Sequence, residues 1–384
     1  MRIARHAWML ARRVAARGPH ARRYPESVID PTLWHEREVL VTGHTGFKGA
    51  WLTLWLQALG ARVSGLSNGV PTSPSLYDLA RVSEGMAAEL TADVRDFASV
   101  RDAVASARPE IVFHMAAQPL VRRSFREPRE TYETNVMGTV NVLEAVRAAD
   151  AVRVAIVVTS DKCYDNREQG RPFAEQDPMG GHDPYSSSKG CAELVVDAYR
   201  RSFFTGDGAT RLASGRAGNV IGGGDWGEDR LIPDVMRAAL SGETIPIRNP
   251  DAVRPWQHVL NPVGGYLRLA EALWEDPAQA GGWNFGPAPG DARAVRWITE
   301  RLNELWPAEL HFELDLGPHP HEARLLALDS SKARERLGWA PPWDLDEALA
   351  RTVAWYRELQ ADSDMRAVSL AQIASFAAAA KVAA

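Results

Sequence analysis

The stretch EVLVTGHTGFKGAWLTLWLQALG, residues 38–60, places a glycine-rich turn between two apolar segments. The residues before the turn predict a buried strand, and those after Gly49 predict a helix. The spacing Gly43-x-x-Gly46-x-x-Gly49 suits a turn whose backbone amides approach a pyrophosphate at a helix N-terminus. Because any tight strand–helix turn favours glycine, the spacing alone is weak evidence for a phosphate-binding loop. The strand, the turn and the helix together predict a dinucleotide-binding loop.

The chain from residue 37 to about 204 alternates short apolar runs with helical patterns. Apolar residues run together in EVLVT, ARVSGL, AAELTAD, EIVFHMA and RVAIVVT, which predicts strands buried on both faces. A further strand is expected in TRLASGRAGNVIG, and helices in FASVRDAVASA and PRETYETNVMGTVNVLEAVRAAD. This alternation of strands and helices predicts an α/β fold with a Rossmann-type doubly wound parallel sheet. A smaller C-terminal substrate-binding lobe is expected after it.

Composition divides the chain into four segments. Residues 1–28 are rich in arginine and are expected to form a disordered basic extension, with a targeting segment as the alternative. Residues 29–222 are expected to form the dinucleotide-binding Rossmann domain, which also receives part of 255–287. Residues 223–360, where Pro, Trp and Gly are frequent, are expected mainly to form the substrate-binding lobe. Residues 361–384 are expected to be an Ala-rich tail with a frayed helix.

Charge and cysteine content limit the possible partners. The formal net charge is −5 although the N-terminus is basic, so the body of the chain is acidic and is not expected to bind nucleic acid. No apolar run approaches the roughly 20 residues of a membrane-spanning helix, so no membrane partner is expected. Cys163 and Cys191 match neither a disulfide framework nor a metal site, so no metal is expected and a cytoplasmic location is predicted.

The stretch DPYSSSKGCAEL places Tyr185 and Lys189 four residues apart, on one face of an expected helix. A nearby ammonium favours the phenolate of a tyrosine, whose ordinary pKa of about 10 makes it a poor base at neutral pH. Ser160, at the end of VAIVVTS, could hydrogen-bond the same substrate hydroxyl. Such a Tyr–Lys pair is common on helix surfaces, but with the glycine loop it predicts hydride transfer at a sugar or alcohol carbon.

Asp161 and Lys162 follow Ser160 in TSDKCYD, at the carboxyl edge of the expected sheet, where ligands bind in such folds. An acid–base pair at this place suits a 4,6-dehydratase. In that reaction oxidation of C4 makes the C5 proton acidic, a base removes it, and an acid protonates the departing C6 hydroxyl. The alternative is a surface ion pair between the two side chains.

The glycine spacing resembles that of the extended short-chain dehydrogenase/reductase superfamily. Ser67-Asn68 stands where an acidic residue often holds the ribose, and no arginine follows, so NAD is preferred over NADP. Asp93 matches the position that holds the adenine amino group, although it could instead cap a helix. The resemblance implies cofactor contacts from Gly43, Thr45, Gly46, Phe47, Gly49, Asp93, Val94, Ala116, Ala117, Gln118, Asn135, Tyr185 and Lys189.

Many stretches between about residues 29 and 355 resemble the CDP-glucose 4,6-dehydratase family, among them VTGHTGFKGAWL, TSDKCYDNRE and RAGNVIGGGDW. This resemblance implies an NAD-dependent lyase that makes CDP-4-dehydro-6-deoxyglucose, a step towards 3,6-dideoxy sugars of bacterial surface polysaccharide. It implies that Tyr185 is the oxidation base, with Lys189 and Ser160 assisting, and that Asp161 is the acid. Lys162 stands where dTDP-glucose dehydratases carry a glutamate, so the C5 base stays open.

Other expectations concern the substrate and the assembly. Arg248 and Arg254 suit a diphosphate because the guanidinium fork matches phosphate oxygens, and Asn219 and His258 are assigned to the substrate as well. The superfamily resemblance implies a homodimer through helices near 129–148 and 183–204, with a dimer of dimers as the alternative. Gly215 departs from the β-branched residue usual before Arg216, which weakens the strand or allows a close backbone approach. The alternative function is another nucleotide-sugar 4,6-dehydratase or a 4-epimerase of the same fold.

Overall fold

The computed structural model describes residues 29–167, 170–315, 317 and 326–383, and the extension expected over residues 1–28 lies outside them. Its centre is a parallel sheet with the strand order β11-β6-β5-β4-β1-β2-β3. The strands are β1 (Glu38–Thr42), β2 (Arg62–Ser67), β3 (Ala88–Thr91), β4 (Ile111–His114), β5 (Val154–Val158), β6 (Arg211–Arg216) and β11 (Gly281–Asn284). The chain runs outward from β1 to β3 and returns to β4 on the other side. The predicted doubly wound parallel sheet is confirmed.

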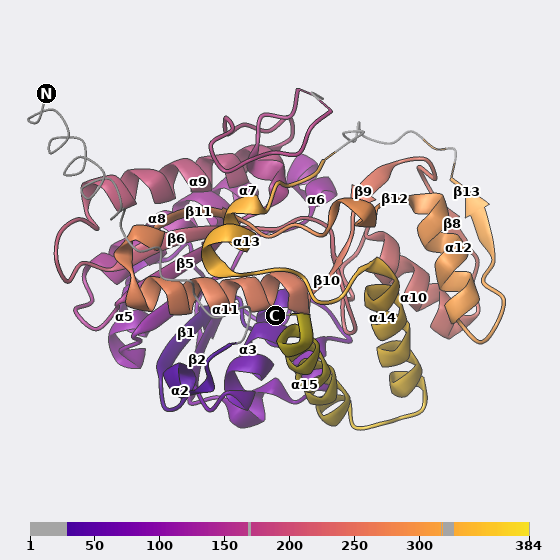
Figure 1. Cartoon of the computed structure of the whole chain (residues 1–384), viewed down its shortest axis with the longest axis horizontal. Helices are drawn as coiled ribbons and strands as arrows, with labels where there is room; N and C mark the ends of the chain where they lie inside the picture. The colour runs from indigo at the N-terminus through magenta and orange to yellow at the C-terminus, as the bar shows by residue number, and fades with distance from the viewer. Residues whose placement is uncertain (1–28, 168–169, 316, 318–325, 384) are drawn as a thin grey trace, which may run out of the picture.

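The central strands bury both faces and send alternate residues into two cores. Val39 and Val41 belong to one core, whereas Leu40 between them belongs to the other. The first core is covered by α3 (Phe47–Ala58) and α11 (Leu260–Glu275), and the second by α5 (Phe97–Ala107), α8 (Gly138–Arg147) and α9 (Pro184–Ser202) (Figure 1). The edge strand β3 is mostly exposed, so the prediction of burial on both faces is wrong there.

Gly215 in β6 gives space to a tyrosine of α11. A Cβ built on this glycine would lie 2.8 Å from Cε1 and 2.9 Å from Cδ1 of Tyr266. Tyr266 is fully buried and packs edge-on against Phe285, with ring centroids 5.5 Å apart. The glycine therefore permits a close approach between strand and helix.

Replacing Gly215 by alanine is expected to lower the free energy of unfolding by about 1–3 kcal/mol, because the added methyl group would displace a ring in a packed core. Urea unfolding measures the change. Gly290→Ala is the matched control, since a Cβ there would meet no atom within 4 Å. Equal stability of the two variants would contradict this account of Gly215.

The smaller lobe is built from helices and short strand pairs (Figure 1). Its strands pair as β8 with β13, β9 with β12, and β7 with β10. The elements are β7 (Val220–Ile221), α10 (Leu231–Ser241), β8 (Ile245–Ile247), β9 (Val253–Pro255), β10 (Gln257–His258), β12 (Ala292–Ala294), α12 (Val295–Leu305), β13 (Phe312–Leu314) and α14 (Leu345–Gln360). Because β11 and α11 lie between these elements in sequence but belong to the large sheet, the chain crosses between the two parts more than once.

The Ala-rich C-terminus is a packed helix, α15 (Met365–Ala383), and the prediction of a frayed tail is wrong. Phe376 is buried between Trp55 of α3 and Trp343, with ring centroids 5.5 Å and 5.0 Å away. Ser369 accepts a hydrogen bond of 3.0 Å from Trp355 Nε1. The large residues of α15 recur at helical spacing, and their burial against tryptophans holds the helix in place.

Candidate active site

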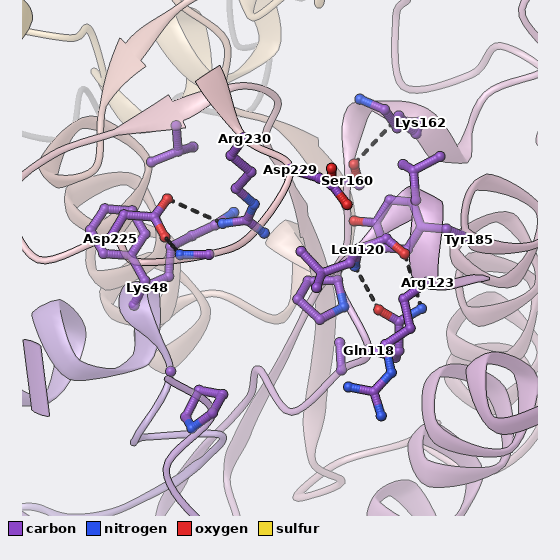
Figure 2. Close-up of a pocket in the computed structure, with 18 of the residues that line it drawn as sticks. Lys48, Gln118, Leu120, Arg123, Ser160, Lys162, Tyr185, Asp225, Asp229 and Arg230 are labelled. Carbon is purple, nitrogen blue, oxygen red and sulfur yellow. Dashed lines mark hydrogen bonds and ion pairs between the residues drawn. The ribbon is translucent and has the colours of Figure 1, made fainter. Parts of the chain in front are cut away.

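A cavity of about 1420 Å³ lies where the carboxyl ends of the central strands face the smaller lobe. Ligands bind at this edge of doubly wound sheets, beside the point where the strand order reverses. Figure 2 shows Tyr185 and Ser160 on one side of the cavity, and Lys48, Asp225 and Arg230 on the opposite side. The predicted site residues that line it are Gly43, Thr45, Gly46, Phe47, Gly49, Asp93, Val94, Ala116, Ala117, Gln118, Ser160, Asp161, Lys162, Tyr185, Lys189, Asn219, Arg248 and Arg254.

The glycine turn joins β1 to α3 as the sequence predicts. Gly43 adopts a left-handed conformation with φ of 73°, and a Cβ on it would lie 2.7 Å from the backbone nitrogen of Ala116. A Cβ on Gly49 would lie 2.1 Å from the carbonyl oxygen of Gly43, so this turn cannot carry a side chain there. Gly46 is the N-cap of α3 and offers no side-chain hydrogen bond to its first amides. The turn thus fits a pyrophosphate against the helix N-terminus.

The expected adenine end of the cavity is held by an ion pair. Asp93 accepts hydrogen bonds from the Arg95 side chain, at 2.6 Å from Nη2, and from the Arg95 backbone nitrogen at 2.9 Å. These hydrogen bonds lower the pKa of Asp93 below its usual value. The alternative role of a helix cap falls to Asp96, whose side chain accepts from Ala98 at the start of α5.

Asn135 does not line the cavity, in contrast to its predicted place among the cofactor contacts. Its side chain instead pairs with the backbone of Gln118, accepting from the nitrogen at 2.8 Å and donating to the oxygen at 3.1 Å. It also donates to Ser188 Oγ on α9 at 2.8 Å. Asn135 therefore supports the wall residue Gln118 and ties it to the helix that carries Tyr185 and Lys189.

Ser160 joins the two groups of predicted catalytic residues. Its hydroxyl lies beside the Tyr185 phenol and donates to Asp161 Oδ1 at 2.9 Å. Asp183 caps α9 by accepting from Ser186, and Pro184 occupies the first turn, so the helix begins immediately before Tyr185. Lys189, one turn further on, donates to the carbonyl of Val158 at 3.4 Å. The strand end and the helix start thus bring the predicted residues together.

Burial shifts the pKa of both members of the Tyr–Lys pair. It raises the pKa of Tyr185 to about 12, although the neighbouring Ser160 hydroxyl opposes this shift. It lowers the pKa of Lys189 to about 8, and the negative charge of Glu193 opposes that shift. Because both changes favour the neutral forms, the phenolate needs additional positive charge or hydrogen bonds from bound ligands.

Glu193 lies one turn beyond Lys189 and is buried in a polar network. Its carboxylate pairs with Arg216 Nη2 at 2.6 Å and accepts from Ser214 Oγ at 2.7 Å, both from β6. It also accepts a hydrogen bond from Thr159, the neighbour of Ser160. A buried charge needs such partners, and here they fix α9 against the ends of β5 and β6.

Asp161 is almost fully buried, which contradicts the alternative of a surface ion pair with Lys162. Its Oδ1 is bonded to Ser160, whereas its Oδ2 has no hydrogen-bond partner among the described residues. Gly218 leaves room for this carboxyl group, since a Cβ on it would lie 2.1 Å from Oδ2. An unpaired buried carboxylate oxygen is costly, so this atom is suited to carry or transfer a proton.

His258 lies away from the cavity, and its assignment to the substrate is wrong. It is fully buried between aromatic rings, with centroids 4.8 Å from Trp343 and 6.2 Å from Trp51. Its Nδ1 accepts from the Leu260 backbone at 3.2 Å, and burial lowers its pKa to about 3. The sequence signal was misleading because a histidine in a Trp-rich stretch can serve packing alone.

Several charged residues in the cavity wall were not predicted. Lys48 lies within the quoted glycine turn, and burial lowers its pKa to about 8, with the charges of Arg230 and Lys189 acting in the same direction. Arg122, Asp229 and Arg230 also line the cavity. A lysine inside a phosphate-binding motif was a signal in the sequence. The others lie in loops whose position only the tertiary structure defines.

The described residues contain no group of three His, Cys, Asp or Glu side chains arranged to hold a metal ion. Within the same part of the chain, no helix combines the length and the apolar character needed to cross a membrane.

Comparison with known proteins shows similarity over most of the chain. The GDP-mannose 4,6-dehydratase family profile matches residues 40–352. A CDP-glucose 4,6-dehydratase of Salmonella typhimurium is 49% identical, covering 91% of this chain and 98% of that protein. The UDP-glucose 4-epimerase of Thermus thermophilus, solved with NAD, is 25% identical with a TM-score of 0.70 and covers 83% of this chain and 98% of its own. An epimerase of Stenotrophomonas maltophila, 21% identical, has the same fold with a TM-score of 0.74, over 85% of this chain and 100% of its own.

Proposed function

Because the chain belongs to the GDP-mannose 4,6-dehydratase family, we propose that it is a lyase that converts CDP-glucose to CDP-4-dehydro-6-deoxyglucose and water, with NAD as cofactor. One observation carries the proposal. Ser160 lies beside the Tyr185 phenol and donates a hydrogen bond to Asp161, so the residue suited to sugar oxidation and the residue suited to elimination lie at one place in the cavity. The cytidine specificity is supported by the 49% identical relative.

The cofactor fits the part of the cavity nearest the glycine turn. Gly43, Gly46 and Gly49 provide the close backbone approach and open helix amides that a pyrophosphate requires. When bound, NAD would supply a positively charged ring able to take up a hydride from C4 of the sugar and to release it at C6. Asp93 and the backbone around Gln118 extend the same wall and would contact the adenine and nicotinamide ends.

The protein's own groups then move the protons. Tyr185 accepts the proton of the C4 hydroxyl, and Lys189 favours the phenolate by its charge and binds the ribose. Ser160 orients the C4 oxygen. Asp161 gives its proton to the C6 hydroxyl as that group leaves as water. Lys162 lines the cavity beside Asp161 and is a candidate for removing the C5 proton, which requires its neutral amine.

The substrate's diphosphate belongs on the side of the smaller lobe. Arg248 follows β8, Arg254 lies in β9, and Asn219 precedes β7, so three short strands present these side chains to one wall. One guanidinium group can donate two parallel hydrogen bonds to phosphate oxygens. The two arginines therefore suit a charged diphosphate more than a neutral sugar.

Incubation of the purified protein with CDP-glucose is expected to give a product lighter by one water that absorbs strongly in the near ultraviolet in alkali. A 4-epimerase would instead return a product of unchanged mass. Parallel incubations with dTDP-glucose and GDP-mannose test the base. Reaction with either of these but not with CDP-glucose would contradict the cytidine assignment while keeping the dehydratase.

A homodimer is part of the proposal. Large apolar side chains are exposed near the helices expected to pair, with 50% exposure for Met137 and 60% for Leu194. Such exposure is uncommon unless another surface covers it, and a second copy provides one. Light scattering of the purified protein measures its mass. We place the enzyme in the cytoplasm, which is supported by the free thiols of Cys163 and Cys191. We also propose that its product is used to make dideoxy sugars.

A further inference from the structure

Asp229 holds two arginines that come from different parts of the molecule. It lies in the loop between β7 and α10, and its Oδ1 is 2.9 Å from Arg248 Nη2 and 3.6 Å from Arg122 Nη1. Arg122 belongs to α6 (Val121–Arg126), which follows the sheet strand β4, whereas Arg248 follows β8 of the smaller lobe. All three residues line the cavity and are partly exposed, at 25–29% of their side-chain surface. One carboxylate therefore bridges the two walls.

The backbone of Asp229 is held in an unusual conformation. Its φ is 59°, in the left-handed region that residues other than glycine avoid. Asp and Asn tolerate this region better than most residues, so the cost is small but real. The neighbouring Glu228 pairs with Arg126 at 3.6 Å on the exposed rim, where both side chains are about 60% exposed. Both acids of the loop therefore lie beside the cavity, but it is Asp229 that pairs with Arg122 and Arg248.

The arginine pair matches the chemistry of a diphosphate. Arg122 and Arg248 both contact one carboxylate oxygen, so a single small anion reaches both guanidinium groups. A diphosphate carries at least two negative charges and several acceptor oxygens, so it binds two guanidinium groups more strongly than one carboxylate does.

We propose that Asp229 is an internal counter-ion that holds Arg122 and Arg248 in the free enzyme and gives way to the diphosphate of the nucleotide sugar. The inference rests on the proposed function, because it takes a nucleotide-diphosphate substrate as given. While Asp229 is in place, it keeps both side chains at the cavity wall and neutralises part of their charge. When the diphosphate enters, it replaces the carboxylate as the bridge between the two walls.

The exchange has a measurable consequence. A nucleoside diphosphate that binds Arg122 and Arg248 must compete with Asp229. Removal of the carboxylate should therefore tighten the binding of that nucleotide. Asp229→Asn keeps the side-chain shape and tolerates the left-handed backbone, and Asp229→Gly suits that backbone without any side chain. For both variants of the NAD-loaded enzyme, the Kd of CDP measured by calorimetry is expected to fall about fivefold, the order expected for loss of a partly exposed ion-pair competitor.

Two comparisons make the result specific. The Kd of cytidine, which has no phosphate, should not change in either variant. Glu228→Gln removes the same charge from the same loop outside the arginine pair and should leave CDP binding unchanged. The proposal is overturned if CDP binds Asp229→Asn with equal or lower affinity, if cytidine gains as much as CDP, or if Glu228→Gln has the same effect.

The test separates this inference from the proposed substrate. If the wild-type protein binds another nucleoside diphosphate and not CDP, the cytidine assignment fails. The Asp229 comparison is then made with that nucleotide and its nucleoside, and its outcome is decided by the same criteria.

Discussion

Tyr185→Phe is expected to reduce the formation of the 4-keto product by about 10²–10⁴-fold, the usual contribution of a positioned general base. The variant loses only the phenolic oxygen, which lies beside Ser160 at the cavity. Without it, the site loses the group that we propose accepts the proton of the C4 hydroxyl. The ring is expected to keep its buried position, so removal of the hydroxyl should cost no more than about 1 kcal/mol of stability. Product absorbance in alkali measures the first effect and thermal unfolding the second.

Tyr199→Phe is the matched control for this experiment. Tyr199 lies on the same helix, and its hydroxyl donates to Glu144 at 2.8 Å, away from the cavity. We expect it to lose this hydrogen bond and to keep its activity. If Tyr185→Phe retained turnover within a few-fold of the wild type, Tyr185 would not be the oxidation base.

Much of the fold could be predicted because its signal is local. The strand β1, the turn at Gly43 and the helix α3 are consecutive, and their order indicates the parallel sheet without long-range information. The exposure of β3 could not be predicted in this way, since an edge strand and a central strand can share composition. The packing of α15 was missed because it also depends on contacts between residues far apart in the sequence. Its alanines conceal a stripe of large residues whose partners are tryptophans far away in sequence.

The candidate site also contains residues that could be predicted from local sequence and residues that could not. Tyr185, Lys189 and Ser160 lie at the ends of regular elements, so their meeting follows from the topology of the sheet. The structure adds what topology does not give, namely the buried position of Asp161 and the counter-charge of Glu193. His258 shows the opposite error, because its aromatic surroundings resemble a ligand site in sequence but form a core in three dimensions. Loop residues such as Asp229 require the folded chain.

Asp161→Asn is expected to block elimination while leaving C4 oxidation possible. The asparagine oxygen can still accept the hydrogen bond that Ser160 gives to Oδ1, so the oxidation residues should keep their positions. The amide cannot supply a proton to the C6 hydroxyl. Formation of the dehydrated product should therefore fall by about 10²–10⁴-fold. The free Oδ2 makes this position the natural source of that proton.

Deuterium oxide distinguishes this block from a general loss of activity. After oxidation of C4, the C5 proton exchanges with solvent, and a stalled reaction can return to CDP-glucose. Mass spectrometry of CDP-glucose recovered from Asp161→Asn should thus reveal deuterium at C5, with little dehydrated product. Asp165→Asn is the control, because Asp165 lies four residues away in a partly exposed pair with Arg167. Dehydration at the wild-type rate by Asp161→Asn would remove Asp161 as the acid, and loss of both product and exchange would place its role before the elimination.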